Sequence, residues 1–156
     1  MSSAEQRLAR LGIELPPAAM PSGTYLQVKR DGRYLQLAGH GPIHPGTGVL
    51  VTGKVGGEVS LARAREAARL TGLQLLATIR GELGSLDRVS SVLRLFGMVN
   101  IAPGFTQTPA VIDGCSELLI DVFGRAVGGH VRSAVGMAEL PFGMAVEIEG
   151  LVTVAE

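Results

Sequence analysis

The sequence has one cysteine, no tryptophan and few aromatic residues, which make up 4% of its 156 positions. A single cysteine excludes a framework of internal disulfides and suits a reducing compartment. No uninterrupted apolar run approaches the roughly 20 residues that a membrane-spanning helix needs. The amino-terminus also lacks the basic stretch followed by an apolar stretch that marks a secretory signal. We therefore expect a cytoplasmic protein that has no membrane partner.

An excess of charge of one sign is also missing, because 14 lysine and arginine residues balance 14 aspartate and glutamate residues. Without a net positive charge or a cluster of basic residues, the chain offers no electrostatic attraction for nucleic acid. The histidines do not predict a metal site, because His40 and His44 lie in a Gly/Pro-rich loop without an accompanying carboxylate. We expect neither a metal nor a nucleic-acid partner.

Glycine is abundant by contrast, with 22 residues, about twice its usual share of roughly 7%. A chain of this length can bury a single core without disulfides. Residues 3–11 form an amphipathic pattern that Gly12 ends, and several prolines follow it. We therefore expect an N-terminal helix and Pro-rich arm over residues 1–22, followed by one domain over residues 23–156.

Local patterns in the domain predict the element order β-β-α-β-α-β-β. The expected elements are strands 25–29 and 34–38 around the turn Asp31-Gly32, helix 58–83, strand 89–99, helix 108–123 ending at Gly124, and two strands around Pro141. This order indicates an α+β fold with two helices on one face of a mixed sheet. Because the strands are too apolar for the other face to meet water, we expect a homo-oligomer that covers it.

Charged residues interrupt an apolar pattern at regular intervals between His130 and Glu149. The guanidinium of Arg132 could grip a carboxylate through two parallel hydrogen bonds, and a nearby glutamate could orient a water molecule. A simpler interpretation is an ion pair of Arg132 with Glu147 or Glu149 across two adjacent strands.

The register of the last two strands decides between these interpretations. With the loop centred on Pro141, Arg132 lies opposite Gly150 and Glu147 points to the other face, whereas a slip of one residue brings Arg132 and Glu147 to the same face. A neighbouring subunit could also supply the glutamate. The sequence leaves these alternatives open.

Two segments resemble the RidA/YjgF family of enamine and imine deaminases. The C-terminal match is Arg132-Ser-Ala-Val, then Leu140-Pro141, then Val146-Glu-Ile-Glu149; the N-terminal match is Gly23-Thr-Tyr25 and Ala38-Gly39-His40-Gly-Pro42 through Gly48. The resemblance extends over about residues 20–154. It implies a chorismate-mutase-like fold, a homotrimer, and active sites in the clefts between subunits.

The resemblance also implies roles for individual residues. Arg132 would bind the carboxylate of a small 2-imino or 2-enamino acid, and Glu147 would orient the hydrolytic water as acid and base. The pocket would further be lined by Tyr25, by the backbone of Gly39, by His40 where the family has glutamine, and by Ala134 where some members have cysteine. No cofactor is required, because the C=N carbon is already electrophilic.

Other interpretations compete with these roles. Ala38, Ala134 and Asp113 depart from the family's usual serine, cysteine and asparagine, so a trimer that binds small carboxylates without catalysis is the alternative function. Ribonuclease activity, a label that some relatives carry, is disfavoured by the balanced charge. By itself Tyr25 is typical of a half-buried strand, and Cys115 is typical of a small buried apolar residue.

Overall fold

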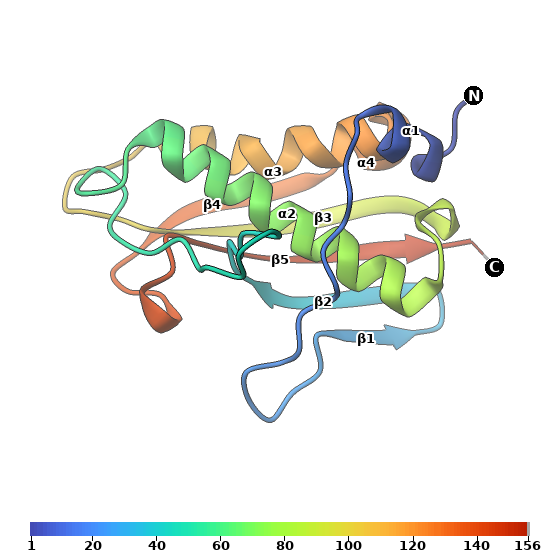
Figure 1. Cartoon of the computed structure of the whole chain (residues 1–156), viewed down its shortest axis with the longest axis horizontal. Helices are drawn as coiled ribbons and strands as arrows, with labels where there is room; N and C mark the ends of the chain where they lie inside the picture. Colours follow the sequence, from blue (N-terminus) through green and yellow to red (C-terminus); the bar gives the residue numbers. More distant parts are fainter. Residues whose placement is uncertain (156) are drawn as a thin grey trace.

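The computed structural model describes residues 1–155, which fold into a five-stranded mixed sheet with helices packed against one face (Figure 1). The strands are β1 (Val28–Asp31), β2 (Tyr34–His40), β3 (Val89–Asn100), β4 (Val131–Met137) and β5 (Val146–Val154). Their spatial order is β1-β2-β5-β3-β4, in which β3 and β4 are parallel and the other neighbours antiparallel. This architecture confirms the expected fold class.

The helices of the described residues are α1 (Ala4–Arg10), α2 (Leu61–Leu83), α3 (Thr108–Phe123) and α4 (Arg125–Gly128), with short 3-10 turns η1 (Leu86–Arg88) and η2 (Pro141–Gly143). Helix α2 begins three residues later than its periodicity suggests, because the Ser60 hydroxyl caps it by accepting a hydrogen bond from the Arg63 amide. Glu58 instead accepts a hydrogen bond from the backbone of Lys54, which holds it in the preceding loop.

The predicted hairpin between β1 and β2 is present. Asp31 pairs with Tyr34, so the two turn residues are Gly32 and Arg33 rather than Asp31 and Gly32. Gly32 has a φ of 57°, in the left-handed region that glycine enters without a steric penalty. The hairpin lies at one edge of the sheet (Figure 1).

The last two strands are not neighbours, so the expectation of a direct pairing between them is wrong. Strand β3 lies between them, and its Leu95 pairs with Arg132 on one side and with Gly150 on the other. The crossover through α3 brings β4 parallel to β3 at the sheet edge, as parallel strands require a long connection. Arg132 and Gly150 are therefore in register across the sheet, but strand β3 separates them.

The two faces of the sheet differ in character. Val146 and Ile148 of β5 are fully buried against the helices, while Glu147 and Glu149 alternate with them on the opposite face. That face also carries exposed apolar side chains of β4, among them Val131, which is 69% exposed. The face without helices is therefore a mixture of apolar and acidic side chains.

The N-terminal segment packs onto the domain. Leu8 of α1 is 3% exposed and belongs to the main core, while the Glu5 carboxylate accepts hydrogen bonds from the Leu86 amide and from Arg80. The arm then descends past α2 toward β1 and β2 (Figure 1), where a Cβ on Gly81 would lie 3.6 Å from Ala18. The arm thereby reaches the end of the sheet that contains the candidate site.

Candidate functional site

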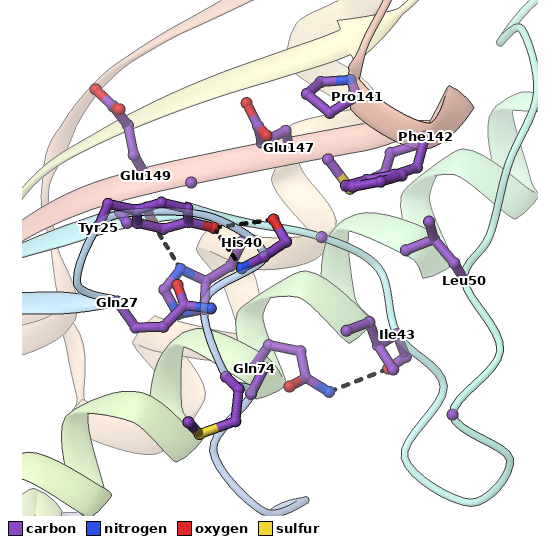
Figure 2. A pocket seen from close by; sticks show the side chains of 18 residues that line it. Tyr25, Gln27, His40, Ile43, Leu50, Gln74, Pro141, Phe142, Glu147 and Glu149 are labelled. Carbon is purple, nitrogen blue, oxygen red and sulfur yellow. Dashed lines mark hydrogen bonds between the residues drawn. The ribbon is translucent and has the colours of Figure 1, made fainter.

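A cavity of about 600 Å³ lies between the N-terminal arm, the end of β2 with the loop after it, η2 and β5 (Figure 2). Four residues selected from the sequence line it together: Tyr25, Gly39, His40 and Glu147. They come from parts of the chain more than 100 positions apart, which the pairing of β2 with β5 brings together. This cavity is the candidate active site.

Glu147 is the acidic group at the centre of the cavity. A Cβ on Gly39 would lie 2.9 Å from its Cδ and 3.2 Å from its Oε1, so the carboxyl group lies directly over the bare β2 backbone and a side chain at position 39 would displace it. Partial burial raises the pKa of Glu147, and the negative charge of Glu149 raises it further. A carboxylate whose pKa is raised is a stronger base than an ordinary glutamate, which favours a role in proton transfer.

His40 has a structural part in this site. It is 3% exposed; its Nδ1 lies 2.6 Å from the Ala38 carbonyl and its Nε2 lies 2.8 Å from the Thr78 hydroxyl. Burial lowers the pKa of His40, which favours the neutral ring that donates to the Ala38 carbonyl and accepts from Thr78. The register of β2 on β5 shifts between Leu37 and His40, so these bonds fix the irregular segment that contains Gly39.

Tyr25 lies at the edge of the cavity, as the resemblance implies, and it is 45% exposed. Its hydroxyl is 3.3 Å from the Ser22 hydroxyl and accepts a hydrogen bond from the Ser22 amide, which ties it to the arm.

The sequence analysis did not identify two polar residues that also line the cavity, Gln27 and Gln74. The Oε1 of Gln27 is buried and has no hydrogen-bond partner among the described residues. Its position two residues after Tyr25 is the signal that could have identified it.

Arg132 lies on the other face of the sheet from Glu147. Its guanidinium donates to the Ser116 hydroxyl at 2.8 Å and to the Pro109 carbonyl at 3.1 Å, both on α3. It also forms an ion pair with Asp113, with 2.8 Å between Nη2 and Oδ1. The interpretation in which Arg132 pairs with Glu147 or Glu149 of the same chain is therefore wrong, because the side chain turns toward α3.

A hollow of about 340 Å³ adjoins the guanidinium, and Arg125, His130 and Ser116 contribute to its walls. The Arg132 side chain is 22% exposed there. His130 supports the arrangement, because its Nδ1 bonds to the Gly128 carbonyl and its Nε2 lies 2.9 Å from the Ser116 hydroxyl. The guanidinium is thus oriented by fixed partners while one side stays accessible to a ligand.

Ala134, the remaining residue selected from the sequence, lies on the same face of β4 as Arg132, where its carbonyl accepts a hydrogen bond from Thr108. It borders neither the Glu147 cavity nor the Arg132 hollow. Within residues 1–155, no three His, Cys, Asp or Glu side chains gather into a potential metal site. No helix in that range combines the length and apolar character needed to cross a membrane.

The mixed sheet with its helices on one face, and the cavity between β2 and β5, define a chain of the YjgF/chorismate mutase-like class. The family model described as "YjgF/chorismate mutase-like, putative endoribonuclease" matches residues 5–146. The chain belongs to this family, which confirms the resemblance to RidA/YjgF proteins.

Individual relatives extend over nearly the whole chain. Protein TCP17 of Trypanosoma cruzi is 42% identical over 145 residues, which cover 93% of this chain and 90% of the relative. A 2-iminobutanoate/2-iminopropanoate deaminase of Dermatophagoides farinae is 29% identical over 143 residues, covering 91% and 94%. The crystal structure of Agrobacterium tumefaciens Atu1372, a protein of unknown function, is similar at a TM-score of 0.87 with 38% identity, covering 97% and 92%.

Proposed function

We propose that the protein is a cytoplasmic homotrimer that hydrolyses 2-imino and 2-enamino acids in clefts formed by two of its subunits. The observation that carries this proposal is Glu147, a carboxyl group with a raised pKa beside the bare backbone of Gly39 in a cavity. Likeness to a 2-iminobutanoate/2-iminopropanoate deaminase over 91% of the chain supports the same chemistry.

The reaction needs one water molecule and one proton carrier. Glu147 takes a proton from the water as its oxygen bonds to the C=N carbon, and it passes this proton to the nitrogen to give a carbinolamine. The same carboxylate then moves the remaining hydroxyl proton to the nitrogen as the carbonyl forms. The C–N bond breaks, giving a 2-oxo acid and ammonia, while an enamine first takes up a proton at carbon to become the imine. Because the C=N carbon is already electrophilic, positioning and this proton relay are sufficient.

The substrate carboxylate requires a cation that the Glu147 cavity does not itself contain. The described residues that line it include Glu147 and Glu149 but neither lysine nor arginine, so an anion alone would be repelled. Arg132 of the same chain faces α3, across the sheet. In the proposed trimer, Arg132 of one subunit binds the carboxylate while Glu147 of its neighbour acts on the imine carbon.

A second candidate function is binding of small carboxylates without catalysis. The ion pair between Arg132 and Asp113 favours it, because a partly neutralised guanidinium can exchange one carboxylate for another without further chemistry. The family description also mentions endoribonucleases. Two carboxylates in the cavity disfavour a phosphodiester substrate, since phosphate oxygens are themselves anionic, and we propose no nucleic-acid partner.

The test follows the decay of 2-iminobutanoate with and without the protein. We expect acceleration that Glu147→Gln lowers in kcat by roughly 10² to 10⁴. Arg132→Gln should lower kcat/KM by about 10² or more through loss of charge-assisted bonds. Arg63→Gln, on the exposed side of α2, is the matched control and should behave like the wild type. If the wild type does not accelerate the decay but binds carboxylates, and Arg132→Gln abolishes that binding, only the binding function remains.

A further inference from the structure

The cavity that contains Glu147 has two chemically different ends. Glu147 and Glu149 form the acidic end on β5. The apolar end is formed by aliphatic, thioether and aromatic side chains: Ile43, Leu50, Pro141, Phe142 and Met144. Figure 2 shows Glu147 between Glu149 on one side and Pro141 and Phe142 on the other, with Leu50 further in that direction.

Two glycines at the end of β2 give the distance between these ends. A Cβ on Gly39 would lie 2.9 Å from the Glu147 carboxyl carbon, whereas a Cβ on Gly41 would contact the Met144 sulfur and lie 3.4 Å from Leu50. Two residues of extended chain span roughly 7 Å. The apolar end therefore begins about one extended side chain away from the acid.

The cavity is large for the smallest imino acids. Its volume of about 600 Å³ lies within the roughly 300–1,000 Å³ that is typical of pockets for ligands larger than these acids. An imino acid with a one- or two-carbon side chain would leave the apolar end in contact with water, which is unfavourable in free energy. A longer side chain would replace that water.

The mouth of the apolar end carries an unusually exposed aromatic side chain, that of Phe142, which is 73% exposed. Phe142 also has a φ of 58° and a ψ of 15°, a left-handed conformation that is uncommon for a bulky residue and is concentrated at functional sites. The backbone thus holds an aromatic ring at the cavity mouth at some conformational cost.

We infer that the substrates are imino or enamino acids with a long or branched apolar side chain, which packs against Leu50, Met144 and Phe142 while the reactive carbon lies beside Glu147. This inference rests on the proposed hydrolytic function and adds the class of substrate to it. The acidic end disfavours a second anionic group, and the residues of the apolar end have no polar side-chain atoms that could bind a polar substrate side chain.

The catalytic test compares imines generated in place from leucine and methionine with 2-iminobutanoate. Each additional methylene in a fitting apolar pocket is worth about tenfold or more in kcat/KM, so the wild type should prefer the larger imines by at least about tenfold. Phe142→Gly, which suits the left-handed backbone, should bring the ratio of the two kcat/KM values close to one. Leu11→Ala, an exposed apolar residue at the end of α1, is the matched control.

Binding of the stable 2-oxo acids keeps the inference separate from catalysis. Calorimetry should give a dissociation constant about tenfold lower for 4-methyl-2-oxopentanoate than for 2-oxobutanoate, a difference that Phe142→Gly removes. If both acids bind equally and both imines react equally, the inference is wrong while the hydrolytic function stands. If neither imine reacts but the larger acid binds more tightly through Phe142, the hydrolytic function is wrong and the apolar specificity stands.

Discussion

Arg132 of β4 and Asp113 of α3 form an ion pair with 2.8 Å between Nη2 and Oδ1. The aspartate is 42% exposed and the arginine 22%, so water reaches both groups. Asp113 occupies part of the guanidinium that a substrate carboxylate would bind. A ligand must therefore displace this carboxylate or share the guanidinium with it.

Asp113→Asn should increase the affinity for carboxylates, because it removes the competing charge while keeping the size of the side chain. An exposed ion pair contributes up to about 1 kcal/mol, so KM for 2-iminobutanoate and the dissociation constant of 2-oxobutanoate should fall by up to about fivefold. Glu117→Gln, which breaks the Arg65 pair on the same helix, is the control. A weaker affinity in Asp113→Asn would show instead that Asp113 orients Arg132 for the ligand.

Glu147→Gln should stabilise the fold near pH 7. Burial and Glu149 raise the Glu147 pKa above its ordinary value of 4.5, so the folded chain holds this proton more tightly than the unfolded chain. Stability is therefore lost as pH rises from about 4.5 through the folded-state pKa. The melting temperature of the variant relative to the wild type should be higher near pH 7 than near pH 4. An equal difference at both pH values would argue against a raised pKa.

Mixed oligomers test whether two chains form each site. Arg132→Gln and Glu147→Gln should each be nearly inactive alone, because every site lacks one group. Unfolding the two variants together and refolding them as a mixture should restore activity, since about one cleft in four of a random equimolar assembly receives both native residues. Activity that stays at the level of the separate variants would place both residues in the site of a single chain, or in no common site.

Cys115 should be unreactive in the native protein. It is fully buried on α3, and burial raises the pKa of its thiol to about 12, although the nearby Arg132 lowers it in part. Because the thiolate is the reactive species, an aromatic disulfide reagent at mildly alkaline pH should modify it at least about a thousandfold more slowly than in the denatured chain. Labelling at comparable rates in both states would contradict this burial.

The elements of the fold follow from local patterns in the sequence. Helix α3 spans Thr108–Phe123 as predicted, because Pro109 suits a first turn and Gly124 ends the helix. Strand β3 ends at Asn100, one residue later than predicted. It is paired on both sides, as its apolar character suggests. The start of α2 differs from the predicted start because the Ser60 side chain caps the helix.

The candidate site was only partly predictable. Tyr25, Gly39, His40 and Glu147 come together in one cavity, and their selection depended on the family motifs more than on any periodicity. The pairing of Arg132 with Asp113 could not be anticipated, because it depends on α3 lying over β4. The apolar end of the cavity was not predicted for the same reason, since Leu50 and Met144 are more than 90 residues apart in the chain.

The sequence by itself determined where helices, strands and turns form and which residues alternate between the two faces of a strand, because these depend on neighbouring residues and fixed backbone periods. Only the tertiary structure decided that β3 separates β4 from β5, and that Arg132 is in register with Gly150, which puts Arg132 and Glu147 on opposite faces. Strand order depends on how crossovers pack against the sheet, which is a property of long-range contacts. The separation of these two residues within one chain is the physical basis for the two-subunit site that we propose.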